Sequence, residues 1–229
     1  MTIHRFFVPA SEMHGERFPL PDGVDHQVLR VLRMRTGDRF MLLDGRGEAA
    51  TCRLEGTDCV VEERGPAGGE PAHRLTVWQA LLRGDHLEPV IRHATEVGVA
   101  EFRLFVSERS VAREVTDRKL ERLRAVAREA AEQSERGLVP EVAAPVPFAD
   151  AVASASVLLL ERTDGPRLSE LEAPKSVVIG PEGGFTPSEV AATEGAGLAI
   201  AGLGPRILRS ESVAVAAAAV ILSRTGDFA

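Results

Sequence analysis

The chain has 229 residues, 44% of them hydrophobic, and a formal net charge of −7, and this length allows one large domain or two small ones. It contains no apolar run of membrane-spanning length and no N-terminal stretch like that of a secretory signal. We therefore expect a soluble, cytoplasmic protein with no membrane partner.

Basic residues are unevenly distributed along this acidic chain. Residues 71–136 carry 12 basic and 11 acidic side chains, whereas residues 137–229 carry 6 basic and 11 acidic ones. Of the 27 cations, only Lys119 and Lys175 are lysines. Arginine suits bidentate phosphate contacts and stacking on bases, so the middle third is a candidate basic patch. A bias in genome composition is the alternative explanation.

The first 65 or so residues are predicted to be mostly β. Segments 39–44 and 49–54 flank a Gly-Arg-Gly turn that is typical of a hairpin, and 59–63 is a further short strand. Before them, Val28, Val31 and Leu32 lie at helical spacing within 25–34. The pattern fits a small β-barrel with one helix.

Cys52 and Cys59 are the two cysteines of the chain, and they lie close together in this β segment. No second cysteine pair completes a zinc site, so we expect no metal. We interpret them as buried thiols on neighbouring strands.

The segment Arg64–Pro71 (RGPAGGEP) is rich in glycine and proline and is interpreted as a linker. From Leu75 onward, strands and helices alternate. The predicted strands are 75–82, 102–106, 157–160, 176–179 and 198–201. Such alternation predicts a mostly parallel sheet covered on both faces, with ligands at the carboxyl ends of its strands.

Four helices are predicted in this second part. One follows a capping box formed by Asp85 and Glu88 and ends at Gly98, and another covers 116–136. The third has Thr186 as its N-cap, with Glu189 closing the box. The last, 211–224, is apolar around nearly its whole circumference, so we expect it to be buried on all sides, in a subunit interface as well as in the core.

Two glycine-proline loops are the candidate sites of chemistry. The first, 179–185 (IGPEGGF), follows a buried strand, and its glycines let the backbone approach a ligand closely. It matches neither G-x-G-x-x-G nor a phosphate-binding loop, which disfavours nucleotide phosphates. The alternative is a plain connector between strand and helix.

The second loop, 203–212 (LGPRILRSES), carries Arg206 and Arg209, which suit contacts with phosphate or with a developing oxyanion. In the alternative interpretation, Arg209 pairs with Glu211 or Glu182, and a serine caps the last helix.

VVIGPEGGFTPSEV and LGPRILRSESVAVAA resemble the ribosomal small-subunit methyltransferase E family of the SPOUT superfamily. The resemblance extends over FFVP, HQVLRVLRMRTGD, LLDGRG, ALLRGDHLEPVIRHATEVGV, SERSV and AREAAEQSERGLVPEV. It implies an α/β protein with an N-terminal PUA-like β-barrel (1–68) for RNA binding and a C-terminal SPOUT methyltransferase domain (72–229) with a trefoil knot. The implied activity is methylation of N3 of uridine 1498 in 16S rRNA of the small ribosomal subunit, by a homodimer that uses S-adenosylmethionine.

The resemblance also assigns cofactor binding to three segments. These are Leu160 and Glu161; Ile179, Gly180, Pro181, Glu182, Gly183 and Gly184; and Leu203, Gly204, Pro205, Arg206, Ile207 and Leu208. Where the family often has R-T-E-T-A, this chain has Arg-Ser-Glu-Ser-Val at 209–213, which keeps the hydroxyls but loses their methyl groups.

Methylation of uridine N3 requires a proton acceptor and a cationic donor near O2 and O4. We expect Arg209 to stabilise the charge and Glu211 or Glu182 to accept the proton. The expected RNA contacts are Arg5, Arg30, Arg33, Arg83, Arg92, Arg109, Arg113 and Arg136. For each of these, a solvated surface arginine is the alternative. A non-catalytic RNA-binding factor and a ribose 2′-O-methyltransferase are the rival functions, and the full-length resemblance argues against the second.

Overall fold

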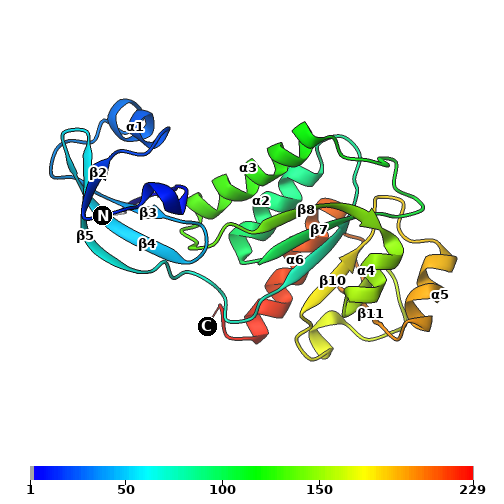
Figure 1. Ribbon diagram of the computed structural model, residues 1–229. Coiled ribbons are helices and arrows are strands. Elements are labelled where there is room, and N and C mark those ends of the chain that lie inside the picture. The colour runs from blue at the N-terminus through cyan, green and yellow to red at the C-terminus, as the bar shows by residue number, and fades with distance from the viewer. Residues whose placement is uncertain (1–2, 229) are drawn as a thin grey trace. The chain divides into compact units, whose positions relative to one another are not determined.

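A computed structural model describes residues 3–228 and has a mixed α/β architecture with two separate sheets (Figure 1). The chain divides into two compact units. The first runs up to Glu70 and also includes Ala131–Val139, and the second consists of Pro71–Ala130 and the chain from Pro140 onward.

The first unit contains a five-stranded sheet in the order β1-β3-β4-β5-β2, in which β1 is parallel to β3 and the other pairs are antiparallel. Its strands are β1 (His4–Phe7), β2 (Arg17–Pro19), β3 (Arg39–Leu43), β4 (Glu48–Glu55) and β5 (Asp58–Pro66). The predicted hairpin is confirmed, and Gly45 and Gly47 adopt positive φ angles of 72° and 111° in its turn. Strand β5 extends to Pro66, so the first residues of the predicted linker belong to the sheet.

The predicted helix of this unit takes a different form. A single turn, α1 (Val24–His26), continues as a π-helix, η2 (Gln27–Val31). A π-helix has more residues per turn than an α-helix, so the 3.6-residue spacing no longer places side chains on one face. Val28 is fully buried, whereas Val31 is 63% exposed and Leu32 is 36% exposed. The helix predicted within 25–34 is therefore present only as α1 and η2, and of the three apolar residues only Val28 is buried.

The core of the first unit contains the two cysteines. Cys52 on β4 and Cys59 on β5 are both free and fully buried, which confirms that they are buried thiols on neighbouring strands. They pack in one cluster with Phe6 and Phe40, whose rings meet edge to face at 6.1 Å.

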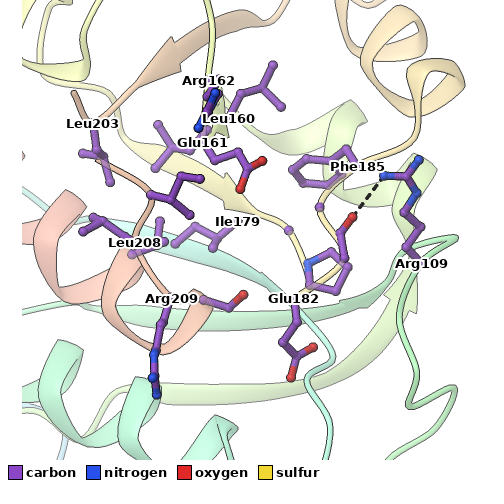
Figure 2. Close-up of a pocket in the computed structure, with 18 of the residues that line it drawn as sticks. Arg109, Leu160, Glu161, Arg162, Ile179, Glu182, Phe185, Leu203, Leu208 and Arg209 are labelled. Carbon is purple, nitrogen blue, oxygen red and sulfur yellow. Dashed lines mark hydrogen bonds between the residues drawn. The ribbon is translucent and has the colours of Figure 1, made fainter. Parts of the chain in front are cut away.

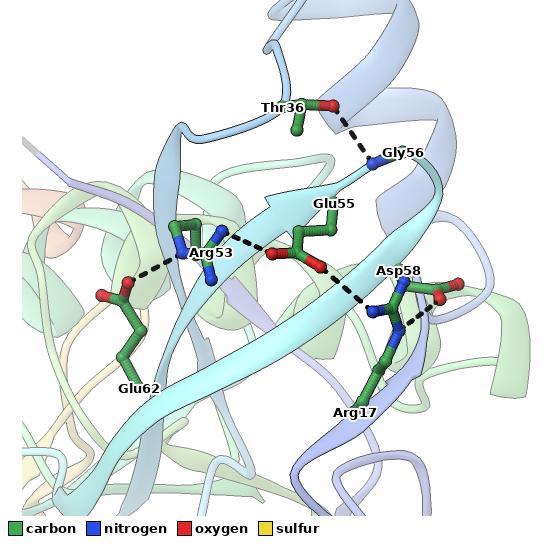
Figure 3. Close-up of polar contacts among 7 residues, drawn as sticks. All are labelled: Arg17, Thr36, Arg53, Glu55, Gly56, Asp58 and Glu62. Atoms are coloured by element: carbon green, nitrogen blue, oxygen red, sulfur yellow. Dashed lines mark hydrogen bonds and ion pairs between the residues drawn. The ribbon is translucent and has the colours of Figure 1, made fainter.

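The surface of this sheet carries a ladder of ion pairs across β2 to β5, and Figure 3 shows the part of it formed by β2, β4 and β5. It runs through Arg39, Glu62, Arg53, Glu55, Arg17 and Asp58, with N–O distances between 2.6 and 3.1 Å. Hydrogen bonds to Asp58 and to Glu55 raise the pKa values of Arg17 and Arg53 above the ordinary value. Exposed pairs of this kind stabilise a fold little, but they neutralise the cations of this face.

Arg136 is buried within the first unit. It is 2% exposed, and its Nε and Nη2 donate to the two carboxylate oxygens of Glu70 at 3.2 and 2.6 Å. The same carboxylate accepts the backbone N–H groups of Gly137 and Leu138. Arg5 donates to the carbonyl oxygen of Glu135. The guanidinium of Arg136 is therefore part of the internal packing and is not accessible for the RNA contact expected from the sequence.

The second unit contains a six-stranded sheet in the order β11-β9-β10-β6-β7-β8, and all of its pairs are parallel. Its strands are β6 (Thr76–Ala80), β7 (Glu101–Val106), β8 (Glu141–Pro147), β9 (Val157–Leu160), β10 (Ser176–Ile179) and β11 (Ala199–Gly202). Its helices are α2 (Leu87–Val97), α4 (Phe148–Ser154), α5 (Pro187–Gly195) and α6 (Ser210–Arg224), and α3 (Asp117–Gln133) has its last turn in the first unit.

Helices cover both faces of this sheet, as predicted. Side chains of α4 and α5 pack on one face, in a cluster with Trp78, Leu158 and Val178. Helix α6 packs against α2 and β10 (Figure 1). Strand β8 and helix α4 were not predicted. The sequence of β8 (EVAAPVP) has two prolines, which are tolerated because this strand lies at the edge of the sheet.

The capping boxes predicted at the start of α2 and of α5 have different outcomes. Helix α2 begins at Leu87 after a backbone turn in which the Glu88 N–H donates to the Asp85 carbonyl, so the predicted side-chain capping box is wrong. The box of α5 is confirmed, because the Glu189 N–H donates to Thr186 Oγ1 at 3.2 Å and the Thr186 N–H donates to Glu189 Oε2 at 2.9 Å.

Helix α6 is buried on one side only within this chain. Its buried residues are Ala214, Ala217, Ala218, Ile221 and Leu222. The apolar side chains of Ala216, Ala219 and Val220 remain partly exposed within the single chain, so the expected burial of this side in a subunit interface stays a prediction. No helix in residues 3–228 is both long and apolar enough to span a membrane.

Candidate functional site

A cavity of about 910 Å³ lies in the second unit, at the carboxyl ends of the neighbouring strands β9, β10 and β11 (Figure 2). Three segments form most of its wall: the end of β9 with the residues that follow it, the loop from β10 to α5, and the loop from β11 to α6. Arg83, His86 and Arg109 also line it. Parallel strands place their carboxyl ends at one edge of the sheet, which brings together segments that are distant in the sequence.

Most of the predicted cofactor residues line this cavity. Leu160, Glu161, Ile179, Gly180, Pro181, Glu182, Gly183, Gly184, Leu203, Arg206, Ile207 and Leu208 all contribute to the wall. Gly204 and Pro205 belong to the same loop but are not part of it. The structure therefore gathers both glycine-proline loops around one space.

The loop from β10 to α5 is shaped by contacts that exclude a side chain. A Cβ atom on Gly180 would lie 3.0–3.3 Å from three ring atoms of Phe185. Gly184 has a φ of 66°, and its N–H donates to the Pro181 carbonyl at 2.9 Å. These glycines satisfy steric requirements of a tight turn next to the cavity.

Phe185 anchors this loop in the core. Its ring is stacked on Phe105, with centroids 6.5 Å apart, and lies 5.6 Å from the ring of Phe148. Phe185 also lines the cavity, so the aromatic cluster fixes the end of the loop that leads into α5.

Glu182 lies on one wall of the cavity, beside residues from the start of α2. Its Oε1 accepts the backbone N–H of Arg83 at 3.1 Å and lies 3.5 Å from Nδ1 of His86. His86 lines the cavity but was not predicted, because a lone histidine before a helix has no distinguishing pattern in the sequence.

Arg209 and Glu211 lie on the wall formed by the loop from β11 to α6. The Arg209 side chain is 87% exposed, and its Nη1 is 3.8 Å from Glu211 Oε1, so the predicted pairing with Glu211 is present. Arg209 is the N-cap residue of α6, and among the described residues no side chain caps this helix, so the alternative in which a serine caps it is not observed. In Figure 2 the side chains of Arg209 and Glu182 both extend away from Glu161.

The arginines expected to bind RNA occupy different environments. Arg83 and Arg109 line the cavity, and Arg109 Nη1 donates to the Gly183 carbonyl at 3.0 Å (Figure 2). Arg113 donates to the carbonyls of Ser107 and Glu108. Arg92 is half-buried on α2. Arg30 and Arg33 are exposed at the end of η2.

Comparison with known proteins agrees with this architecture. The model of an RNA methyltransferase domain matches residues 69–222, and that of an RNA methyltransferase PUA domain matches residues 28–61. The chain is 35% identical to ribosomal RNA small subunit methyltransferase E of Synechocystis, over 96% of this chain and 78% of that protein. Identity to the Bacillus subtilis protein of the same name is 31%, over 97% of each chain.

A solved structure is also similar over nearly the whole chain. The ribosomal RNA small subunit methyltransferase E of Neisseria gonorrhoeae, crystallised with S-adenosylmethionine, has a TM-score of 0.87 and 28% identity, over 97% of this chain and 98% of that one. The sequence matches, the family models and the fold lead to one assignment. The chain belongs to the ribosomal RNA small subunit methyltransferase E family.

Proposed function

We propose that the chain methylates N3 of uridine 1498 in 16S rRNA of the small ribosomal subunit, with S-adenosylmethionine as the methyl donor. The observation that carries the proposal is the cavity, whose wall is built from the same two loops that resemble the family. The membership of the chain in a methyltransferase family supports the reaction class.

The cavity suits S-adenosylmethionine in size and chemistry. Its volume of about 910 Å³ is within the range of small-molecule sites. Leu160, Ile179 and Leu208 offer apolar surface for the adenine ring, and carboxylates such as Glu161 complement a positively charged ligand. When bound, the cofactor supplies a methyl group activated by its sulfonium.

We assign the handling of uracil to Arg209 and Glu211. Loss of the N3 proton leaves negative charge on O2 and O4, which the exposed guanidinium of Arg209 is suited to stabilise. Glu211 is the favoured proton acceptor because it lies beside Arg209, whereas Glu182 already accepts the Arg83 N–H. Glu182 remains the second candidate.

For the domain organisation, we propose a PUA-like RNA-binding barrel at 1–68 and a SPOUT domain with a trefoil knot at 72–229. The match to a PUA model at 28–61 and the five-stranded sheet support the first. The match to an RNA methyltransferase model at 69–222 and the all-parallel six-stranded sheet support the second.

The proposed RNA contacts include the exposed Arg30 and Arg33 in the first unit and, separately, Arg83 and Arg92 in the second. Arginine side chains in such positions bind the phosphate backbone independently of sequence. Binding to the small subunit is therefore expected to weaken as the salt concentration rises.

We also propose that the chain forms a homodimer through α6. Ala216, Ala219 and Val220 lie at helical spacing and form a partly exposed apolar stripe on this helix. Ile207, in the loop that precedes the helix, is 57% exposed. Exposed apolar surface of this kind is typical of a protein interface.

Primer extension tests the product directly. Small subunits that lack the methyl group are incubated with the protein and S-adenosylmethionine, and reverse transcriptase is expected to stop at uridine 1498 because the N3 methyl group blocks its pairing edge. Methyl incorporation without this stop would instead indicate a ribose methyltransferase. If calorimetry showed no binding of S-adenosylmethionine, the rival function of a non-catalytic RNA-binding factor would be favoured.

We expect Gly180→Ala to weaken cofactor binding. The added Cβ would overlap Phe185, and overpacking of this kind costs about 1–3 kcal/mol, which corresponds to a rise of roughly tenfold in the Kd for S-adenosylmethionine if the loop moves to relieve it. Gly195→Ala is the matched control, because no described atom lies within 4 Å of a Cβ added at that position. Equal Kd values for the two variants would contradict the proposed role of the loop.

A further inference from the structure

The carboxylate of Glu189 makes more contacts than its place in a helix cap requires. The side chain is 7% exposed, and the capping box uses only the bond from the Thr186 N–H to Oε2. The other oxygen, Oε1, accepts the hydroxyl of Ser107 and the backbone N–H of Glu108, each at 2.9 Å. These two partners belong to the loop that follows β7, about 80 residues earlier in the chain.

The two loops are connected by carboxylates from both sides. Glu108 extends its own carboxylate to the start of α5, where Oε2 accepts the Thr186 hydroxyl at 3.0 Å. Arg113 Nη1 and Nη2 donate to the carbonyls of Ser107 and Glu108 and close the loop on itself. Hydrogen bonds to charged, buried acceptors are stronger than neutral ones, so this cluster is a rigid junction between two loops.

This junction adjoins a contact between two residues that line the cavity. Arg109, in the same loop, donates to the Gly183 carbonyl at 3.0 Å (Figure 2), and a Cβ on Gly183 would lie 3.3 Å from Arg109 Cβ. Arg109 and Gly183 are both exposed, so their own contact does not fix their positions. The buried carboxylate of Glu189 holds the two loops at the separation that this contact needs.

We propose that Glu189 is a positioning residue of the cavity: its carboxylate holds the loop 107–113 against the loop 180–186, and thereby fixes Arg109 and the Gly183 backbone for the cofactor. The inference rests on the proposed function only in taking S-adenosylmethionine as the occupant. Glu189 does not itself line the cavity, so its effect is transmitted through the two loops.

The test is Glu189→Gln. A glutamine has one acceptor oxygen, so its NH₂ group must face either the Thr186 N–H or the donors of Ser107 and Glu108, and a buried donor loses its acceptor. We expect the Kd for S-adenosylmethionine to rise about tenfold in calorimetry, with kcat at saturating cofactor within about twofold of the unchanged chain. Hydrogen exchange at the amides of Glu108 and Thr186 is expected to accelerate together.

Thr193→Val is the matched control. The Thr193 hydroxyl is fully buried on the same helix and donates to the Glu189 carbonyl at 2.8 Å, so its loss weakens α5 without touching the junction. We expect its Kd for the cofactor to stay within about twofold of the unchanged chain. If Thr193→Val weakened binding as much as Glu189→Gln, a general loss of helix stability would explain both, and the proposal would be overturned.

A milder variant covers the case in which Glu189→Gln fails to fold. Ser107→Ala removes one donor to Oε1, and we expect a rise of about threefold in the Kd for S-adenosylmethionine. An unchanged Kd in Ser107→Ala would then overturn the proposal. If the unchanged chain itself does not bind S-adenosylmethionine, the proposed function fails, while coupled hydrogen exchange at Glu108 and Thr186 still reports whether the junction exists.

Discussion

We expect Arg209→Ala to lower kcat by about a hundredfold, which is the typical loss when one donor to a developing oxyanion is removed. The proposed role predicts this because the guanidinium is 87% exposed and Glu211, its carboxylate partner, lies 3.8 Å away, so it is available for the oxygens of a uracil. Single-turnover methylation of small subunits at saturating cofactor measures the change, and calorimetry is expected to give a Kd for S-adenosylmethionine within about threefold of the unchanged chain.

Arg118→Ala is the matched control for this variant, because it also removes an exposed arginine from the second unit and lies outside the wall of the cavity. We expect Arg209→Lys to retain part of the activity, since it keeps the charge but loses the planar fork. A kcat within about threefold of wild type in Arg209→Ala, less than about 1 kcal/mol in the barrier, would exclude the assignment.

We expect Arg136→Ala to lower the free energy of unfolding of the first unit by about 3–5 kcal/mol, the typical effect of removing one partner of a buried ion pair. The guanidinium side chain is 3% exposed, and without it the Glu70 carboxylate keeps the N–H groups of Gly137 and Leu138 but loses its cation. Urea unfolding followed by circular dichroism measures the loss, and its midpoint is expected to fall without a change in slope.

Arg122→Ala provides the comparison, because Arg122 forms an exposed pair with Glu88 at 3.2 Å. Exposed pairs stabilise proteins little, so we expect its unfolding midpoint to be nearly unchanged. Similar unfolding midpoints for Arg122→Ala and Arg136→Ala would show that the Arg136–Glu70 pair stabilises the protein no more than an exposed pair does. Glu70→Gln distinguishes loss of charge from loss of the hydrogen bonds, since it keeps the shape of the side chain.

The elements that the sequence predicted well are those whose cause is local. The box of α5 depends on Thr186 and Glu189, three residues apart, and the hairpin between β3 and β4 depends on its glycines. The two glycine-proline loops were singled out from a few consecutive residues, and both line the cavity. The elements that were missed, such as β1 and β8, are short or rich in proline and are stabilised by neighbouring strands.

The same distinction between local and tertiary causes applies to the arginines. The sequence treated Arg109, Arg113 and Arg136 alike, as cations in a basic segment. In the structure, Arg109 and Arg113 donate to backbone carbonyls of the loops near the cavity, and Arg136 is bound to Glu70. The charge of each arginine can be read from the sequence. The acceptor to which it donates can lie tens of residues away in the chain, so only the structure identifies it.

By itself, the sequence determined the alternation of strands and helices, the two loops and the resemblance to one methyltransferase family. The tertiary structure decided which residues share a wall: it brought His86 to Glu182, left Gly204 and Pro205 outside the cavity, and joined Glu189 to Ser107. The physical reason is that spacing along the chain encodes local hydrogen bonding and periodic burial. The parallel order of β9, β10 and β11 alone sets which loops converge at the carboxyl edge of the sheet.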